Sequence, residues 1–387
     1  MIPYGRQDIQ DSDIKAVVEV LNSDFLTQGP AIPRFEACVK NHCGARHAVA
    51  ANSATSALHI SMLALGVSSG DYVWTSPITF VASSNAALYC GAQVDFVDID
   101  PCTYNMCSKA LEQKLAQAAQ HNRLPKVVIP VHLTGQSCDM QAIHELSLKY
   151  GFKVVEDASH AIGGSYQALP IGNCAYSDIT VFSFHPVKII TTAEGGVALT
   201  NDDSLATRLQ LFRNHGITRD PNLMSHDMHG PWYYQQIELG YNYRITDIQA
   251  ALGTSQMTRL DAYISRRHEI ADRYNHELAD LPLTLPYQAE YSCSAYHLYV
   301  LRLKLDFIAP LTHRSVFENL RTRGILVNLH YIPVHTHPYY QNLGFQNGDF
   351  PQAEAYYSNA ISIPMYAGLT AEDQSTVINA LHRILTS

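Results

Sequence analysis

A single lysine stands in the segment SFHPVKIITTAEGGVAL (183–199), which follows an apolar run. Lys188 is the only lysine between Lys153 and Lys304, so it does not belong to a solvated pattern of charges. A lysine held among apolar or cationic groups loses its proton more easily, and its free amine can form a Schiff base with an aldehyde. The segment therefore predicts an amine that reacts with a carbonyl compound.

A second segment, KVVEDASHAIGG (153–164), ends an apolar run on two carboxylates, Glu156 and Asp157. A buried carboxylate is costly unless a cation pairs with it. Asp157 is thus a candidate partner for a cationic group of a ligand. The alternative is that Asp157 only caps the next turn.

A third segment, AANSATSALH (50–59), places Asn52, Ser53, Thr55 and Ser56 between a predicted strand and a predicted helix. Free backbone N–H groups, hydroxyls and the helix dipole favour a phosphate there, although an ordinary helix cap would need only one such residue. The segment is neither a G-x-G-x-x-G fingerprint nor a P-loop.

The three segments together offer a phosphate site, an amine for an aldehyde and a carboxylate for a ring cation. These are the requirements of pyridoxal phosphate, whose ring withdraws electrons when its nitrogen stays protonated opposite a carboxylate. The sequence therefore predicts a pyridoxal 5′-phosphate enzyme.

The elements around these segments predict an α/β fold. From about 46 to 200, short β-rich runs alternate with helical ones, which indicates a mostly parallel sheet flanked by helices, with ligands at the carboxyl ends of its strands. We expect a large cofactor-binding domain over 1–245 that includes the N-terminal segment, connecting helices over 246–279, and a smaller α+β domain over 280–387. In the last domain we expect strands at 295–305 and near 326–332, a helix at 313–324, an apolar segment at 360–365 and a final helix opened by Thr370.

Composition excludes several classes of protein. The chain has 387 residues and a formal charge of −9, the wrong sign for a protein that binds a nucleic-acid backbone. No stretch approaches the roughly 20 apolar residues of a membrane span, and the first residues lack a secretory pattern. We expect a cytoplasmic protein without a metal, because the histidines of HYIPVHTH (330–337) lack further ligands at usual spacing.

The chain resembles the DegT/DnrJ/EryC1/StrS family of sugar aminotransferases over nearly its whole length. The resemblance rests on FLTQGP (25–30), NSATSALH (52–59), TFVASSNA (79–86), VVEDASHAIGG (154–164), FSFHPVKIITTAEGG (182–196), GYNYRITDIQAALG (240–253) and ISIPMY (361–366). It implies the fold-type I aminotransferase architecture and a homodimer with active sites at the interface.

The resemblance also implies roles for residues around the cofactor. Lys188 would carry the cofactor and then move protons between the donor's α-carbon, the cofactor's C4′ and the sugar C4, and Asp157 would pair with the ring nitrogen. The remaining cofactor contacts would be Ala54, Thr55 and Ser183 on the phosphate and Phe80 on one ring face. Asn242 would contact the phosphate of the cofactor that is bound to the partner subunit.

Three positions depart from the commonest family pattern. His160 stands where many members have a glutamine near the phenolic oxygen of the ring; it could donate the same hydrogen bond, stack on the ring, or only fill space. The residues after Lys188 read VKII, and Ala193 occupies a usual glycine position.

Within the family, IPYGRQ, NSATSALH, FSFHPVK and HYIPVH most resemble the members that aminate C4 of a UDP-linked 4-keto-6-deoxy-N-acetyl-L-hexosamine, with L-glutamate as amino donor. The sugar contacts implied are Tyr4, Phe25, Leu26, Thr27, Gln28, His330 and Tyr331, for which core packing is the alternative. Candidates for holding the diphosphate are Arg6, Arg213, Arg219 and Arg244.

Three alternatives remain open at this point. Another UDP- or dTDP-4-keto-6-deoxyhexose is an alternative substrate. A sugar 3-dehydratase, a relative that lacks the reactive lysine, is opposed by Lys188. A non-enzymatic relative is opposed by the joint presence of Lys188, Asp157 and Ser183.

Overall fold

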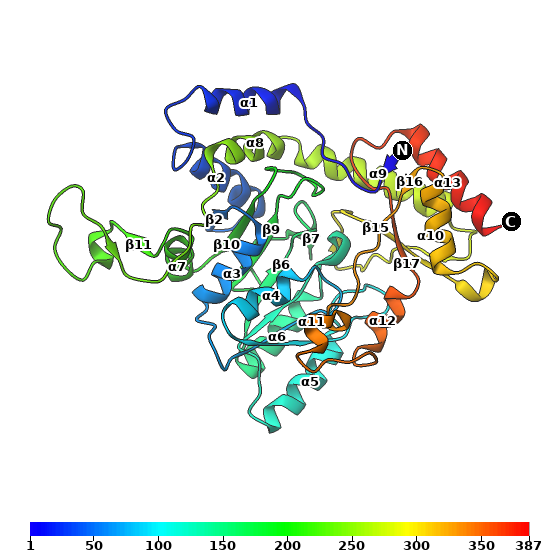
Figure 1. The fold of residues 1–387 in the computed structure, drawn as a ribbon, viewed down its shortest axis with the longest axis horizontal. Helices are drawn as coiled ribbons and strands as arrows, with labels where there is room; N and C mark the ends of the chain where they lie inside the picture. The colour runs from blue at the N-terminus through cyan, green and yellow to red at the C-terminus, as the bar shows by residue number, and fades with distance from the viewer. Residues whose placement is uncertain (387) are drawn as a thin grey trace.

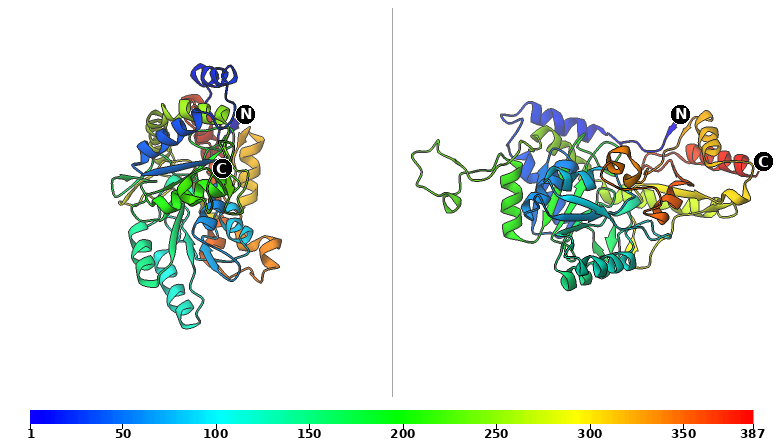
Figure 2. Two further views of the ribbon diagram at one scale, coloured as in Figure 1. Left: turned by 90° about the vertical axis from the view of Figure 1, so that its left-hand side faces the viewer. Right: turned by 60° about the horizontal axis from the view of Figure 1, so that its bottom comes forward.

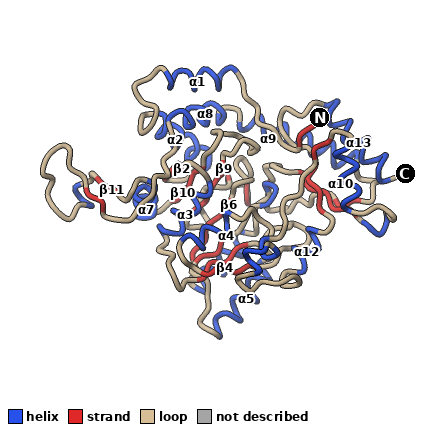
Figure 3. The backbone as a smooth tube through the Cα atoms, viewed as in Figure 1, coloured by secondary structure: helices blue, strands red, loops and turns tan. Residues whose placement is uncertain are grey.

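The computed structural model describes residues 1–386 and is built around one seven-stranded sheet (Figures 1 and 3). The strands lie in the order β2 (His47–Ala51), β10 (Gly196–Thr200), β9 (Ile179–Ser183), β6 (Lys153–Asp157), β5 (Val127–Ile129), β3 (Tyr72–Thr75) and β4 (Gln93–Phe96). Only β10 runs antiparallel to its neighbours, and β9, β6, β5, β3 and β4 are parallel. The prediction of a mostly parallel sheet is confirmed.

The strands are apolar on both sides because helices cover both faces of the sheet. In β6, Val154 faces one core and Val155 the opposite one. In β10, Val197 and Leu199 face one side and Ala198 the other. One face packs against α3 (Ala54–Ala64), α4 (Ala82–Tyr89) and α7 (Asp203–Arg213); the opposite face packs against α2 (Ala31–Cys43), α5 (Ser108–Gln120), α6 (Met140–Tyr150) and α8 (Asp247–Met257).

Two helices fill the predicted connection between the lobes. The helix α8 begins with Thr246 as cap, and α9 (Leu260–Glu277) follows it. Ile270, Ala271 and Tyr274 of α9 belong to the core of the C-terminal lobe. The connection is therefore part of the packing on which that lobe is built.

The C-terminal lobe contains a small antiparallel sheet of β13 (Leu283–Thr284), β15 (Tyr299–Leu303) and β17 (Ala360–Ile363). The helices α10 (His313–Thr322) and α13 (Ala371–Leu385) pack on it. Thr370 caps α13 by accepting a hydrogen bond from the N–H of Asp373 at 3.0 Å, as predicted.

The strand expected near 326–332 is confined to β16 (Ile325–Leu326), which pairs in parallel with β1 (Ile2–Pro3). Beyond it, only Asn328 keeps a bridge, to Ser362, because the chain turns there toward the cavity described below. The first strand thus pairs with the C-terminal lobe, and the N-terminus lies beside β16 in Figure 1. A later stretch with α11 (Pro338–Gln341) and α12 (Pro351–Tyr357) returns to pack on Phe96 of the large lobe.

Two segments stand apart from the body of the molecule. The helix α1 (Asp11–Leu21) lies over α8, and an arm that begins at β11 (Ile217–Thr218) and returns through β12 (Gln235–Gln236) projects outward (Figures 1 and 2). The arm exposes large apolar side chains, including Met228, Trp232 and Tyr234. No helix among residues 1–386 is long and apolar enough to cross a membrane.

One glycine allows β10 to pass directly against the start of α3. A Cβ on Gly196 would lie 2.5 Å from the backbone nitrogen of Ala54, so a larger residue would push backbone against backbone. We expect Gly196→Ala to lower the free energy of unfolding by about 1–3 kcal/mol, measured by urea denaturation. Gly368→Ala is the control, since its Cβ would meet only Tyr366 at 3.9 Å; equal losses in both variants would contradict this explanation.

Candidate active site

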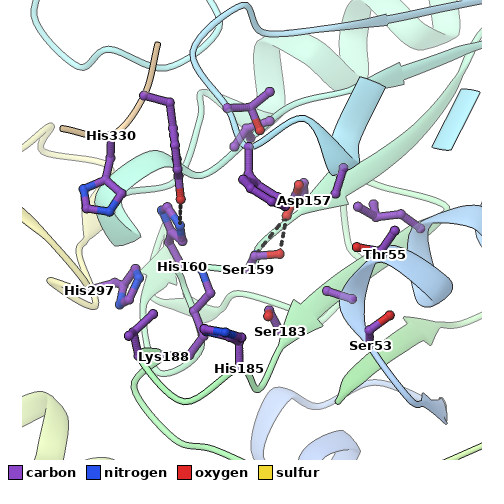
Figure 4. Close-up of a pocket in the computed structure, with 18 of the residues that line it drawn as sticks. Ser53, Thr55, Asp157, Ser159, His160, Ser183, His185, Lys188, His297 and His330 are labelled. Carbon is purple, nitrogen blue, oxygen red and sulfur yellow. Dashed lines mark hydrogen bonds between the residues drawn. The ribbon is translucent and has the colours of Figure 1, made fainter. Parts of the chain in front are cut away.

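Lys188 and Asp157 line the same cavity, of about 550 Å³, at the carboxyl ends of β6 and β9. The two strands are parallel neighbours in which Asp157 pairs with Val181. Asp157 is the last residue of β6, and Lys188 lies in the loop that follows β9. Figure 4 shows Ser53 and Thr55 at one side of this cavity and His297 and His330 at the opposite side, with Asp157 and Ser159 between them. The sheet thus brings the two residues to one place, although 30 positions separate them in the sequence.

The amine of Lys188 is prepared to react. Burial lowers the pKa of Lys188 to about 8, although the nearby carboxylate of Asp157 acts in the opposite direction. Its Nζ has no hydrogen-bond partner in the part of the chain that the structure describes. About a tenth of the side chain is therefore an unprotonated amine at pH 7, far more than for an ordinary lysine with a pKa of 10.5.

The carboxylate of Asp157 is held by two serines that the sequence analysis did not identify. Oδ2 accepts a hydrogen bond from the hydroxyl of Ser83 at 2.6 Å. Oδ1 accepts from the hydroxyl of Ser159 at 2.6 Å and from its N–H at 3.1 Å. Hydrogen bonds to the charged form favour a carboxylate in a buried place. Ser159 could have been found as the residue two positions after Asp157, but no local signal links Ser83 to it.

The phosphate site predicted at the start of α3 has free donors. Ser53 caps the helix by accepting from the N–H of Ser56 at 3.1 Å. The N–H groups of Ala54 and Thr55 in the first turn have no partner within the helix. The hydroxyls of Thr55 and Ser183 line the cavity, and neither forms a hydrogen bond to a residue within 1–386. These groups suit a phosphate dianion at the positive end of the helix.

His160 is an uncharged hydrogen-bond donor. Its Nδ1 accepts a hydrogen bond from the N–H of Thr134 at 3.3 Å, so the proton is assigned to Nε2, which donates to the hydroxyl of Tyr331 at 3.1 Å. Burial lowers the pKa of His160 well below the ordinary histidine value, and the charges of Lys188 and His330 add to this effect. His160 lines the cavity, where it is within reach of a bound ligand.

Four other predicted contacts also line this cavity: Phe80, Tyr4, His330 and Tyr331. The rings of Tyr4 and His330 are 5.1 Å apart. Both ring nitrogens of His330 have partners, Ser362 at 2.8 Å and Asn328 at 3.4 Å. Burial lowers the pKa of His330 to about 3, so this residue contributes an uncharged wall.

The other predicted contacts lie elsewhere on the same chain. Residues 25–28 and Asn242 are exposed and do not line the cavity of Lys188. Asp247 anchors the first segment, since its carboxylate accepts from the N–H groups of Gly29 and Ala31, each at 2.8 Å. A second hollow, of about 590 Å³, is lined by Gln28, Arg213, Arg219 and Arg244. Arg6, the fourth arginine candidate, is exposed and lines neither hollow.

The residues present fit pyridoxal phosphate. Donors without partners converge on one end of the cavity, a hydrogen-bonded carboxylate lies farther in, and a free amine shares the same space. We therefore compared the chain with known proteins.

The sequence profile of the DegT/DnrJ/EryC1/StrS aminotransferase family matches residues 7–382. This chain belongs to that family. It is 38% identical to the spore coat polysaccharide biosynthesis protein SpsC of Bacillus subtilis, over 99% of this chain and 97% of the relative. It is 36% identical to the UDP-4-amino-4,6-dideoxy-N-acetyl-beta-L-altrosamine transaminase of Campylobacter jejuni, over 100% and 98%. It is also 36% identical to the GDP-perosamine synthase of Caulobacter vibrioides, over 95% and 94%.

Solved structures agree with this assignment. PseC of Helicobacter pylori, an aminotransferase involved in the biosynthesis of pseudoaminic acid, superposes with a TM-score of 0.90 at 32% identity, covering 100% of this chain and 99% of PseC. The putative sugar aminotransferase Spr1654 of Streptococcus pneumoniae, in its PMP-form, has the same score at 29% identity, over 100% and 99%; a PLP-form is also solved. The predictions of the family, the fold and pyridoxal phosphate dependence are confirmed, and the chain is a sugar aminotransferase.

The departures from the family pattern are accommodated. Ile189 and Ile190 after the lysine are buried in the core beside α2 and α8. Ala193 adopts a left-handed backbone conformation with φ of 66°, which explains why glycine is usual at this position of the aminotransferase. Neither change removes a group that lines the reactive end of the cavity.

The pKa of Lys188 predicts how the cofactor-free aminotransferase combines with pyridoxal phosphate. Only the unprotonated amine attacks an aldehyde, so the rate of binding should rise with pH and level off above about 8, not near the ordinary lysine value of 10.5. Since Asp157 raises the pKa of Lys188, Asp157→Asn should move the midpoint to lower pH. Stopped-flow absorbance measures both; a midpoint near 10 in the unaltered protein would show that burial does not activate this amine.

Proposed function

We propose that this aminotransferase moves the amino group of L-glutamate to C4 of a UDP-linked 4-keto-6-deoxy-N-acetyl-L-hexosamine, UDP-2-acetamido-2,6-dideoxy-beta-L-arabino-hex-4-ulose, in pseudaminic acid biosynthesis. The observation that carries the proposal is the free amine of Lys188 beside Asp157, with Tyr4, His330 and Tyr331 on the wall of the same cavity. The Campylobacter transaminase and Helicobacter PseC support the choice of sugar. A cytoplasmic location remains part of the proposal.

When bound, pyridoxal phosphate takes up an amino group and withdraws electrons from the carbon that carries it. Ala54, Thr55 and Ser183 would hold its phosphate, Asp157 would pair with the ring nitrogen, and Phe80 would contact the ring. His160 donates the hydrogen bond of its Nε2 toward the phenolic oxygen. Nζ of Lys188 removes the proton from the donor's α-carbon and, in the second stage, delivers a proton to C4 of the sugar. The two substrates therefore react in turn at one cavity.

A related 4-keto-6-deoxyhexose on another nucleotide is the second candidate substrate. The GDP-perosamine synthase of Caulobacter is as similar in sequence, at 36%, as the Campylobacter transaminase. Overall sequence identity therefore does not show which of the two sugars is the substrate. The residues that line the cavity must determine this choice.

A product assay distinguishes these sugars. We expect L-glutamate consumption with the UDP-linked L-arabino 4-keto sugar to have a kcat/KM at least about 10-fold above that with GDP- or dTDP-linked 4-keto sugars, a difference of one well-placed contact. Mass spectrometry identifies the aminated product. Lys188→Ala, which should lose both turnover and the visible absorbance of the bound cofactor, is the control. A preference for the GDP-linked sugar would favour the second candidate.

The proposed enzyme is a homodimer whose subunits complete each other's sites. Supporting this, Phe25 and Leu26 are about half exposed, and Trp232 on the arm is 72% exposed. Asn242 and the hollow with Arg213, Arg219 and Arg244 lie outside the cavity of their own chain, although the resemblance implies a phosphate contact for Asn242 and the arginines are candidates for holding the diphosphate. A second copy would cover the apolar residues and bring this surface to the other site.

Mixed dimers test this arrangement. Alone, Lys188→Ala should be inactive and Asn242→Ala weakly active, because each variant lacks part of both sites. Coexpressed in equal amounts, they should recover about a quarter of the unaltered activity, since half of the dimers would contain one intact site. Sedimentation checks the dimer itself. Absence of recovery in a confirmed mixed dimer would place Asn242 outside the partner's site.

A further inference from the structure

His297 is a wall residue of the active-site cavity to which neither the sequence motifs nor the proposed mechanism assigns a task. It lies just before β15 and is 4% exposed. Its ring packs against that of His160, with centroids 4.4 Å apart and an angle of 51° between the planes. The side chain therefore reaches the place where the cofactor ring and the substrates are expected.

The ring of His297 presents one free polar atom to the cavity. Nδ1 is sealed from solvent and has no hydrogen-bond partner. Nε2 also bonds to none of residues 1–386, but it is not sealed off, so it is the nitrogen that a ligand can contact. A buried N–H without a partner is costlier than an unused lone pair, so the proton belongs on Nε2. His297 thus offers a neutral N–H donor.

The charges around His297 keep it neutral. Burial lowers its pKa well below the ordinary histidine value, and His160, Lys188, Arg267 and His330 act in the same direction. No carboxylate of residues 1–386 pairs with its ring.

Arg267 fixes the position of His297. This guanidinium is 2% exposed, and its Nη1 donates to the carbonyl oxygens of Tyr296, His297 and Met365 at 3.0, 3.2 and 3.1 Å. Arg267 comes from α9, so the helix that connects the lobes holds the backbone of His297 in place. A donor held in this way loses little entropy when it binds a ligand.

The cavity contains no arginine of its own. Lys188 is the only lysine or arginine among the described residues that line it, and Asp157 and Glu194 add negative charge. Nε2 of His160 already donates to Tyr331, and both nitrogens of His330 have partners. His185 lies at the exposed rim, 4.0 Å from Glu194. His297 therefore holds the one uncommitted imidazole N–H in the interior among these residues.

We propose that Nε2–H of His297 donates a hydrogen bond to a carboxylate oxygen of the amino donor, so that this site recognises an amino acid through a neutral imidazole. The inference rests on the proposed function, in which an amino acid and a keto-sugar occupy the same cavity in turn. A neutral donor suits this exchange, because it can pair with the carboxylate of the amino donor and leaves no buried charge without a partner when the uncharged sugar ring takes its place. A buried guanidinium would lose its counter-ion when the uncharged sugar ring arrived.

The test separates the two half-reactions of the holoenzyme. His297→Phe keeps the ring volume and removes the donor, and His297→Gln restores an N–H. In single turnovers with L-glutamate, His297→Phe should raise the half-saturating concentration about 10- to 100-fold, the effect of losing one hydrogen bond to a charged group. His297→Gln should recover part of this loss. The half-reaction of the aminated enzyme with the keto-sugar should change less than about 3-fold.

A binding measurement gives a readout that does not depend on turnover. Calorimetric titration of the holoenzyme with glutarate, an unreactive dicarboxylate, should show the same loss of affinity in His297→Phe. The matched control is His313→Phe, since His313 bonds to the carbonyl of Ala360 away from the cavity. The control should leave both half-reactions unchanged.

Several results would overturn the inference. An effect confined to the sugar half-reaction would make His297 a sugar contact, and equal effects on both, with weaker cofactor binding, would make it a packing residue. Unchanged glutamate saturation in His297→Phe, together with a large effect of Arg219→Ala or Arg244→Ala, would assign the carboxylate to an arginine of the partner subunit. If the unaltered enzyme does not react with L-glutamate, the proposed amino donor is wrong, and the inference about His297, which depends on it, is wrong too.

Discussion

The active site depends on the parallel pairing of β6 with β9. This register places Asp157 opposite Val181, so the end of β6 and the loop after β9 open on the same side of the sheet. Behind Asp157, the buried pair of His132 and Glu156 joins the segment after β5 to β6, with Nε2 and Oε2 at 2.6 Å. The N–H of His132 also donates to the carbonyl oxygen of Asp157 at 3.1 Å. Contacts with both neighbouring strands therefore hold the backbone that carries the Asp157 carboxylate.

The cavity maintains an unusual balance of charge. Burial lowers the pKa of its one amine and keeps the imidazoles of His160, His297 and His330 neutral. Asp157 accepts hydrogen bonds from Ser83 and Ser159. A site arranged in this way can accept a dianionic phosphate at one end and leave the other end free for substrates that differ in charge.

Two parts of the chain form the walls of the cavity. The large lobe supplies the groups proposed to hold the cofactor, whereas His297, His330 and Tyr331 come from the C-terminal lobe or the segment leaving it. Arg267 of α9 ties this second set to the connection between the lobes. Relative movement of the lobes would therefore alter the substrate end of the cavity more than its phosphate end.

The sequence by itself determined the cofactor chemistry and the sheet. Lys188, Asp157 and the Ser53–Ser56 turn each follow or precede a strand, and local patterns mark strand ends well because apolar runs stop there. Only the tertiary structure decided which distant side chains complete the site. Ser83 lies 74 positions from Asp157, and Arg267 of α9 lies 30 positions before His297, so no periodicity or spacing connects them. The tertiary structure also decided that residues 25–28 and Asn242 lie outside the cavity of their own chain. Asp247 holds residues 25–28 against α8 through the adjacent backbone, and backbone pairing with Asn214 holds Asn242. Such contacts depend on how helices and strands pack against one another, and the order of residue types in the sequence does not show this.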